Sequence, residues 1–196
     1  MILYLHGFKS SPQSFKARVI GDAMAAQGRA AQYRCPQLPA SPAAAVALAL
    51  SLVRAVPVHQ LTVIGSSLGG FYATWIAEQL GCRAVLLNPA VQPPRDLEQY
   101  VGVGNAYHSD QPFEFKHAYI DELRALTVPA ITRPERYLLI AATGDEVLDW
   151  RQMQAHYPGA RQVIIQGGDH GISDFRDYLT TVLAFCDQPF NFKKLQ

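Results

Sequence analysis

The chain has 196 residues, of which 49% are hydrophobic and 17% are charged. Seventeen basic and sixteen acidic side chains leave a formal net charge of +1, so the low hydrophobicity and high charge of disordered chains are excluded. The length predicts one domain, 1–196. A nucleic-acid-binding protein would show a clustered basic footprint, and the charges here form no such cluster, so we expect no nucleic-acid partner.

The sequence also indicates where in the cell the protein is expected. The longest apolar stretch, residues 43–53, is too short and too rich in alanine to cross a bilayer. No basic segment or cleavage site typical of a signal peptide follows Met1. The three cysteines, Cys35, Cys82 and Cys186, have no CxxC spacing. We therefore predict a cytoplasmic protein with reduced thiols and no membrane partner.

Short apolar runs alternate along the chain with longer segments of helical periodicity. The runs predicted as strands are residues 2–5, 31–34, 61–65, 84–88, 137–142 and 162–166. The segments predicted as helices are residues 14–27, 42–56, 68–80, 151–156 and 173–186. Several runs are continuously apolar, which is typical of parallel strands buried on both faces. The alternation predicts an α/β fold with a doubly wound, mostly parallel sheet of about six strands.

One segment, residues 92–132, interrupts this alternation. It contains Pro93, Pro94, Gly102 and Pro112, and only then a short helical pattern near residues 119–126. Prolines and glycines at this density do not fit a plain crossover helix. We expect a small cap-like insertion over one edge of the sheet, without a core of its own.

The strand at 61–65 runs through Gly65-Ser66-Ser67-Leu68-Gly69 into the helix at 68–80. A G-x-S-x-G motif between a strand and a helix predicts a nucleophile elbow with Ser67 at its apex. Gly65 and Gly69 are needed because a Cβ at either position would collide with the neighbouring strand or helix. The alternative is an ordinary strand–helix turn whose glycines only permit close packing. Ser66 is a rival nucleophile, but it precedes the apex and is interpreted as structural.

A serine nucleophile requires a histidine base that is oriented by an acid. Of the six histidines, His170 lies on a glycine-rich loop after the last predicted strand, from which it can reach the serine. We therefore predict His170 as the base. Four others are predicted to be surface or structural residues: His59, His108, His117 and His156.

The acid is expected at the carboxyl end of the strand at 137–142. Asp145 follows that strand and is the predicted acid, although an Asx-turn role is the alternative. Glu146 is expected to point to solvent, and Asp149 to cap the next helix. The order serine, aspartate, histidine along the chain is typical of α/β-hydrolases.

An oxyanion requires backbone N–H donors from two places. Leu68, directly after the nucleophile, is one predicted donor, and Phe8, after the short His6-Gly7 motif, is the other. Gly7 would permit close approach, and His6 is expected to brace the loop. The alternative for His6 is a metal ligand, together with the predicted base and acid. No HxH or HExxH spacing supports a metal site, and no phosphate-binding motif is complete, so we expect neither metal nor cofactor.

Short segments in order over almost the whole chain match a known family. They are residues 3–8, 10–12, 36–39, 63–70, 72–75, 88–91, 143–149, 167–168 and 170. In these segments the chain resembles the α/β-hydrolase superfamily, and within it the small bacterial esterases of the YqiA type. The resemblance implies an α/β-hydrolase fold and esterase activity on short-chain acyl esters. It also implies Ser67 as nucleophile, Asp145 as acid and His170 as base.

The expected chemistry is hydrolysis of a small-molecule ester through an acyl-enzyme intermediate. Two alternatives stay open. An acyl-CoA thioesterase would use the same three residues and differ only in its leaving group. A non-catalytic α/β-hydrolase-like binding module would usually have a broken triad, whereas all three residue types are present here.

Overall fold

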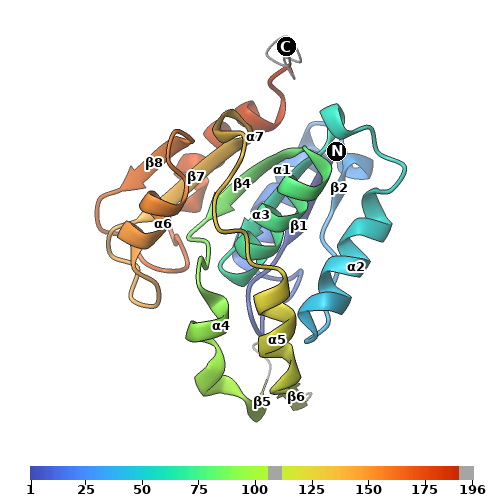
Figure 1. Cartoon of the computed structure of the whole chain (residues 1–196). Coiled ribbons are helices and arrows are strands. Elements are labelled where there is room, and N and C mark those ends of the chain that lie inside the picture. The colour runs from blue at the N-terminus through green and yellow to red at the C-terminus, as the bar shows by residue number, and fades with distance from the viewer. Residues whose placement is uncertain (106–111, 190–196) are drawn as a thin grey trace.

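A computed structural model describes residues 1–105 and 112–189 of the chain. Its centre is a six-stranded sheet with the strand order β2-β1-β3-β4-β7-β8, in which all neighbouring strands are parallel (Figure 1). The strands are β1 (Ile2–Leu5), β2 (Tyr33–Arg34), β3 (Thr62–Ser66), β4 (Arg83–Leu87), β7 (Tyr137–Ala142) and β8 (Arg161–Ile165). The predicted doubly wound parallel sheet is confirmed.

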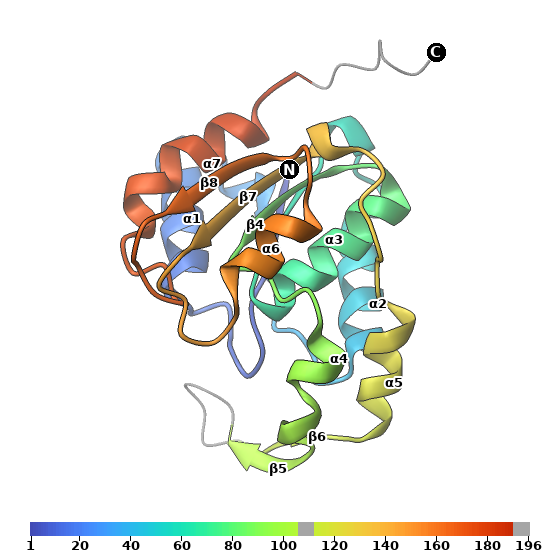
Figure 2. The same cartoon turned by 60° about the vertical axis from the view of Figure 1, so that its left-hand side comes forward.

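Helices cover both faces of this sheet (Figure 2). One face carries α1 (Phe15–Ala26) and α7 (Leu179–Cys186). The other face carries α2 (Pro42–Val53), α3 (Leu68–Leu80) and α6 (Trp150–His156). Two hydrophobic clusters fill the two interfaces between the sheet and these helices.

The strands contribute alternate side chains to the two clusters. In β4, Leu86 packs in the cluster with α2, α3 and α6, whereas its neighbour Leu87 packs in the cluster with α1 and α7. Both leucines are fully buried. This burial on both faces explains why the strands are continuously apolar in sequence.

Three predicted elements are shorter than expected, and one of them is the helix predicted at 42–56, which ends at Val53. The strand predicted at 31–34 is extended only at Tyr33 and Arg34, because β2 is an edge strand that pairs with β1 at these two positions. The residues before it form a 3₁₀ turn, Ala30–Gln32. The helix predicted at 173–186 begins as a second 3₁₀ turn, Phe175–Tyr178, and becomes α-helical only at Leu179.

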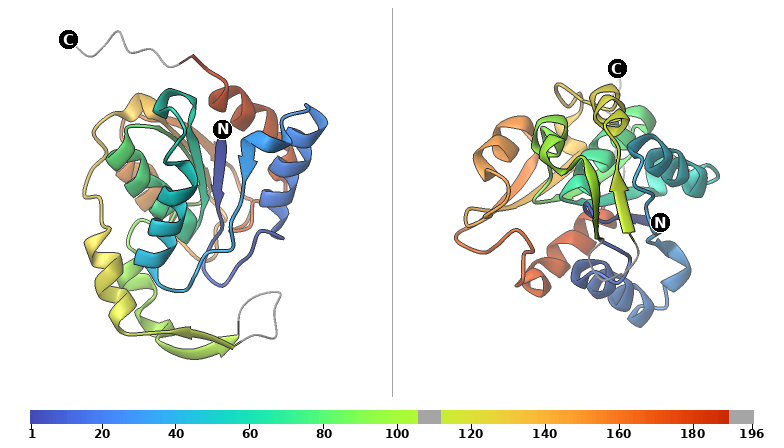
Figure 3. Two further views of the ribbon diagram at one scale, coloured as in Figure 1. Left: turned by 90° about the vertical axis from the view of Figure 1, so that its right-hand side faces the viewer. Right: turned by 90° about the horizontal axis from the view of Figure 1, so that it is seen from below.

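The described residues from α4 to α5 lie beyond the carboxyl ends of the strands, and the chain then runs back to the start of β7 (Figure 3). They form α4 (Pro93–Asp96), a 3₁₀ turn (Glu98–Tyr100), the antiparallel pair β5 (Gly102–Asn105) and β6 (Pro112–Phe115), and α5 (Ala118–Ala125). The helix predicted near 119–126 corresponds to α5, whereas the two strands were not predicted. Glu122 of α5 accepts hydrogen bonds from Ser41 and Ala43 at the start of α2.

The three cysteines are free thiols, as predicted. Burial raises the pKa of Cys35 to about 11 and those of Cys82 and Cys186 to about 12. At neutral pH these thiols are therefore protonated and poorly nucleophilic. Among the helices in the described ranges, none combines the length and the apolar character needed to cross a membrane.

Candidate active site

The turn between β3 and α3 carries Ser67 in a strained backbone conformation. Ser67 has φ 54° and ψ −121°, a region that residues with a side chain rarely occupy. Its N–H donates to the carbonyl of Leu87 on the adjacent strand β4, at 3.1 Å. The strained turn places Ser67 at the carboxyl edge of the sheet and at the N-terminus of α3, where helix dipoles favour negative charge.

The glycines on either side of Ser67 permit this turn. A Cβ on Gly65 would lie 2.1 Å from the carbonyl oxygen of Gly69, at the start of α3. A Cβ on Gly69 would lie 2.0 Å from the carbonyl oxygen of Leu5, at the end of β1. Both contacts are with backbone atoms that cannot move aside, so the collisions predicted from the motif are present in the fold.

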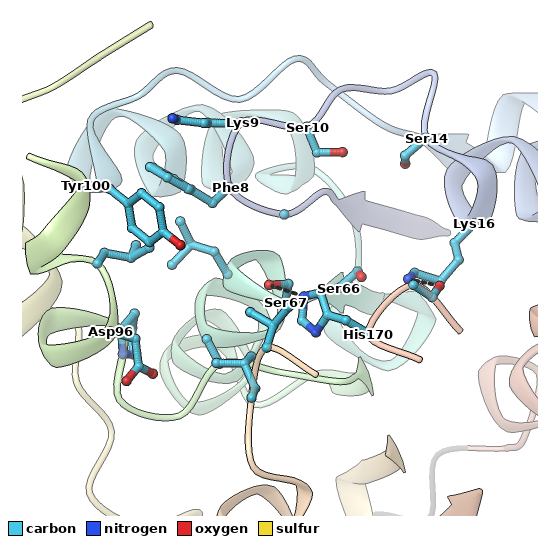
Figure 4. Close-up of a pocket in the computed structure, with 18 of the residues that line it drawn as sticks. Phe8, Lys9, Ser10, Ser14, Lys16, Ser66, Ser67, Asp96, Tyr100 and His170 are labelled. Carbon is cyan, nitrogen blue, oxygen red and sulfur yellow. Dashed lines mark hydrogen bonds between the residues drawn. The ribbon is translucent and has the colours of Figure 1, made fainter. Parts of the chain in front are cut away.

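Three side chains from distant parts of the chain form a hydrogen-bonded chain. His170 Nε2 lies 3.0 Å from Ser67 Oγ (Figure 4), and His170 Nδ1 lies 2.8 Å from Asp145 Oδ2. The Asp145 side chain is fully buried, and its other oxygen accepts hydrogen bonds from the N–H groups of Val147 and Leu148, each at 2.8 Å. In this arrangement the carboxylate holds the proton on Nδ1 and turns the lone pair of Nε2 toward the serine hydroxyl.

Asn88 holds the loop that carries His170. Its Nδ2 donates to the carbonyls of Asp169 and His170, both at 3.0 Å, and its Oδ1 accepts from the N–H of Ala142 at 2.8 Å. The side chain is completely buried, and the backbone φ is 43°. Sequence reasoning assigned Asn88 no role. The available signal was an amide residue directly after an apolar strand and before Pro89.

Glu146 is exposed, as predicted, but its carboxylate also accepts a hydrogen bond from the N–H of His170 at 2.9 Å. This bond forms because the loop after β7 folds against the loop after β8. Thr143 N–H donates to the Ile165 carbonyl, and Gly144 N–H donates to the Gly167 carbonyl, both at 2.8 Å. Asp149, as predicted, caps a helix, accepting from the N–H of Arg151 at the start of α6.

His6 is buried beneath the loop that contains Gly7 and Phe8. Its Nδ1 donates to the carbonyl of Gly7 at 2.9 Å, and its Nε2 accepts from the N–H of Leu38 at 3.0 Å. Burial lowers the pKa of His6, so the ring is neutral at pH 7. Both ring nitrogens are occupied, which favours the bracing role over metal ligation. Among the described residues no cluster of three or more potential metal ligands occurs.

A cavity of about 620 Å³ opens above Ser67 and His170. Phe8 and Leu68, the predicted oxyanion donors, line it. Gly7 approaches the serine closely, since a Cβ on Gly7 would lie 3.2 Å from Ser67 Cβ. These residues therefore meet at one edge of the sheet, although they come from the loops after β1 and β3.

Three of the remaining histidines, His59, His117 and His156, do not line this cavity. The fourth, His108, is not among the described residues. His59 is exposed in the 3₁₀ turn before β3. His117 precedes α5, and His156 ends α6 with its ring against Tyr157. None of these three contacts the hydrogen-bonded chain of Ser67.

A family model covers almost the whole chain. The model of the uncharacterised protein family UPF0227 matches residues 1–187. This range includes every residue of the hydrogen-bonded chain and of the cavity wall.

Several solved structures are similar to this one. Alpha/beta hydrolase domain-containing protein 10 from mouse is 16% identical with a TM-score of 0.72, covering 95% of this chain and 89% of its own. Est1E from Butyrivibrio proteoclasticus, with bound ferulic acid, is 14% identical with a TM-score of 0.65, covering 94% and 85%. The esterase domain of a Rhodothermus marinus protein is 21% identical with a TM-score of 0.63, covering 94% and 85%. At these identities the likeness establishes the α/β-hydrolase fold.

Proposed function

The chain belongs to the UPF0227 family within the α/β-hydrolase superfamily, and we propose that it is a serine esterase acting on short-chain acyl esters. The observation that carries this proposal is the hydrogen-bonded chain from Asp145 through His170 to Ser67, which opens into a cavity. The structural similarity to proteins named as esterases is consistent with the proposal. Fold alone would be insufficient, because one fold hosts many functions.

The first half of the reaction forms an acyl-enzyme. Ser67 Oγ attacks the ester carbonyl carbon while His170 Nε2 takes the hydroxyl proton. Asp145 stabilises the imidazolium that results. The tetrahedral intermediate then collapses, the bond to the alcohol oxygen breaks, and His170 gives its proton to that oxygen. In the second half, water takes the place of the alcohol and releases the carboxylic acid by the same route.

The oxyanion is bound by backbone N–H groups of Phe8 and Leu68. The positive end of the α3 dipole adds to this stabilisation. His6 holds the Phe8 loop through its bonds to Gly7 and Leu38. Removing one such donor from an enzyme of this type costs about 10²–10³ in turnover.

The size and wall of the cavity support a small substrate. A volume of about 620 Å³ lies within the range of roughly 300–1,000 Å³ that is typical of small-molecule sites. Phe8, Leu68, Leu97 and Tyr100 give one end an apolar wall, which suits a short acyl chain. The covalent chemistry proposed above uses only the side chains of Ser67, His170 and Asp145. The proposal therefore includes no cofactor.

The test is active-site labelling combined with turnover. A fluorophosphonate probe should label Ser67 in the folded protein, and p-nitrophenyl butyrate should be hydrolysed faster than the longer p-nitrophenyl palmitate. Ser67→Ala should abolish labelling and lower turnover by several orders of magnitude. Ser66→Ala is the matched control, and it should retain labelling at residue 67. Failure of the probe to label the folded protein, or full activity in Ser67→Ala, would refute the proposal.

A further inference from the structure

Lys16 is a buried lysine in the wall of the cavity that contains Ser67 and His170. It is the second residue of α1 and is only 8% exposed. Its Nζ donates a hydrogen bond to the carbonyl of Gly171, the residue directly after His170. Figure 4 shows Lys16 approaching the cavity from the side of His170. A charged side chain is thus buried next to the proposed base.

The charge of Lys16 has no ion-pair partner in the described part of the chain. The carboxylates that attract it from a distance are Asp169 and Asp145. Asp145 already accepts from His170, and Asp169 accepts from the N–H and hydroxyl of Ser173. A buried charge whose hydrogen bond reaches only a neutral carbonyl is costly without an anion. Lys16 therefore forms no direct ion pair in the described residues, although Asp169 and Asp145 lie close enough to attract its charge.

Lys16 keeps its charge at neutral pH. Burial lowers the pKa of Lys16 to about 8, against the opposing attraction of Asp169 and Asp145. The side chain is therefore mostly an ammonium at pH 7, with three N–H donors. Only one of them is needed for the carbonyl of Gly171. The other two are available to a bound ligand.

Ser14 provides a second polar group at the same end of the cavity. It occupies the N-cap position of α1, but its side chain caps no backbone N–H. Its hydroxyl is buried and makes no hydrogen bond of standard geometry among residues 1–105 and 112–189, although the Tyr4 hydroxyl interacts with it. Ser14 and Lys16 both line the cavity, at the positive end of the dipole of a 12-residue helix. All three features favour an anion.

Given the esterase function proposed above, we propose that Lys16 and Ser14 bind a carboxylate or phosphate on the alcohol portion of the substrate. His170 must protonate the departing alcohol oxygen, so the alcohol portion lies on the His170 side of Ser67. Lys16 lies on that side, whereas the aromatic rings of Phe8 and Tyr100 lie at the opposite end (Figure 4). The acyl chain occupies that aromatic end.

The test compares esters that differ only in one charge. The butyrate ester of 3-hydroxybenzoate has an anionic alcohol portion, and the butyrate ester of methyl 3-hydroxybenzoate is its neutral counterpart. The mono-p-nitrophenyl ester of succinate carries its charge in the acyl portion, with p-nitrophenyl butyrate as the neutral counterpart. The wild type should have a higher kcat/KM for the anionic member of the first pair only.

Two lysine variants separate the site from general electrostatics. Lys16→Gln should lower the anionic-to-neutral ratio of kcat/KM in the first pair about tenfold or more, as expected for a lost charge-assisted hydrogen bond. Lys9→Gln removes the same charge at the aromatic end of the cavity, where Lys9 Nζ lies 5.5 Å from the Phe8 ring centre. That variant should keep the wild-type ratio.

An unchanged ratio in folded Lys16→Gln would overturn the proposal. So would an equal loss on both esters, which would indicate that Lys16 only holds the Gly171 loop. A preference for the succinate ester would overturn the placement on the alcohol side. If Lys16→Gln does not fold, calorimetric titration of the wild type decides: 3-hydroxybenzoate should bind at least tenfold more tightly than its methyl ester. That binding measurement does not depend on turnover. A failure of the anion-site proposal can therefore be distinguished from a failure of the proposed esterase function.

Discussion

Single side chains hold the proposed catalytic loop in place across the sheet. Asn88 sits at the end of β4 and bonds to three backbone groups, on the loop of His170 and at the end of β7. A buried side chain that satisfies several backbone groups leaves all of them unsatisfied when it is removed. We therefore predict that Asn88 is a positioning residue, which acts on the proposed reaction through His170.

Replacing Asn88 by alanine should impair both stability and turnover. We expect a loss of about 1–3 kcal/mol in the free energy of unfolding, because buried carbonyls and an N–H lose their partner. We also expect kcat to fall about tenfold or more with little change in KM, since a displaced base affects chemistry more than binding. Urea denaturation and ester kinetics would measure the two effects. Gln60→Ala, which removes an exposed amide, is the control; equal effects in both variants would contradict the prediction.

His6 illustrates a titratable residue that serves as a neutral hydrogen-bonding group. Burial lowers its pKa, and its Nε2 accepts a hydrogen bond that a protonated ring cannot accept. The unfolded chain therefore binds a proton at this position more readily than the native state does. By linkage, the free energy of unfolding falls as the pH drops below about 6.5, the ordinary pKa of histidine. Burial lowers the pKa of His156 as well, which adds to the same trend.

The His6→Gln variant should therefore show a shallower loss of stability between about pH 6.5 and pH 5. The contribution of His156 should persist in that variant. His59→Gln, which removes an exposed imidazole, is the control for the substitution itself. Urea denaturation at a series of pH values would make the comparison. A wild-type slope in His6→Gln would show that His6 does not titrate differently in the two states.

At the scale of elements, the unit that matters is the strand–turn–helix formed by β3, Ser67 and α3. The turn brings the start of α3 against the end of β1. A Cβ on Gly69 would lie only 2.0 Å from the carbonyl oxygen of Leu5. Close packing of this kind is what keeps Ser67 in its strained conformation. Strain at Ser67, the proposed nucleophile, is therefore maintained by contacts that only glycine permits.

Gly69→Ala should prevent the elbow from forming. We expect no cooperatively folded protein, or a large fall in Tm with loss of fluorophosphonate labelling, as measured by circular dichroism and labelling. Gly28→Ala is the matched control. Gly28 has φ +69° but open space around it, so the variant should lose only about 1–2 kcal/mol, the cost of a left-handed alanine. Similar losses in the two variants would refute the steric argument.

At the scale of the whole molecule, two helical layers enclose one parallel sheet. This architecture buries both faces of the central strands, and it leaves the carboxyl edge of the sheet open to ligands. The loops after β1, β3, β4, β7 and β8 meet at that edge. Residues that are far apart in the chain therefore share one cavity.

Leu86 and Leu87 provide a direct test of the two covered faces. Each is fully buried, in opposite hydrophobic clusters. Leu86→Ala and Leu87→Ala should each cost about 2–5 kcal/mol in the free energy of unfolding. Val101→Ala, at a position 38% exposed, should stay within about 0.5 kcal/mol of the wild type. Urea denaturation would measure all three. If one leucine variant matched the Val101 control, one face of the sheet would be open.

Features that depend on neighbouring residues could be predicted from the amino-acid sequence. Apolar runs predicted the central strands, because a strand buried on both faces needs continuous hydrophobic side chains. The G-x-S-x-G motif predicted the turn at Ser67, because the steric limits of that turn act within a few residues. The edge strand β2 was predicted too long, and the pair β5–β6 was not predicted. Neither has a continuous apolar run that would indicate a strand.

Contacts between distant groups became evident only from the three-dimensional structure. Asn88 bonds to residues 81 and 82 positions away, and Lys16 bonds to a carbonyl 155 positions away. Glu146 turned toward His170 because two loops pack against each other. Such contacts depend on the strand order and on loop packing, which leave no periodic pattern in the chain. The physical reason is that a hydrogen bond between two loops requires the two groups to be close in space. It places no limit on how many residues separate them along the chain.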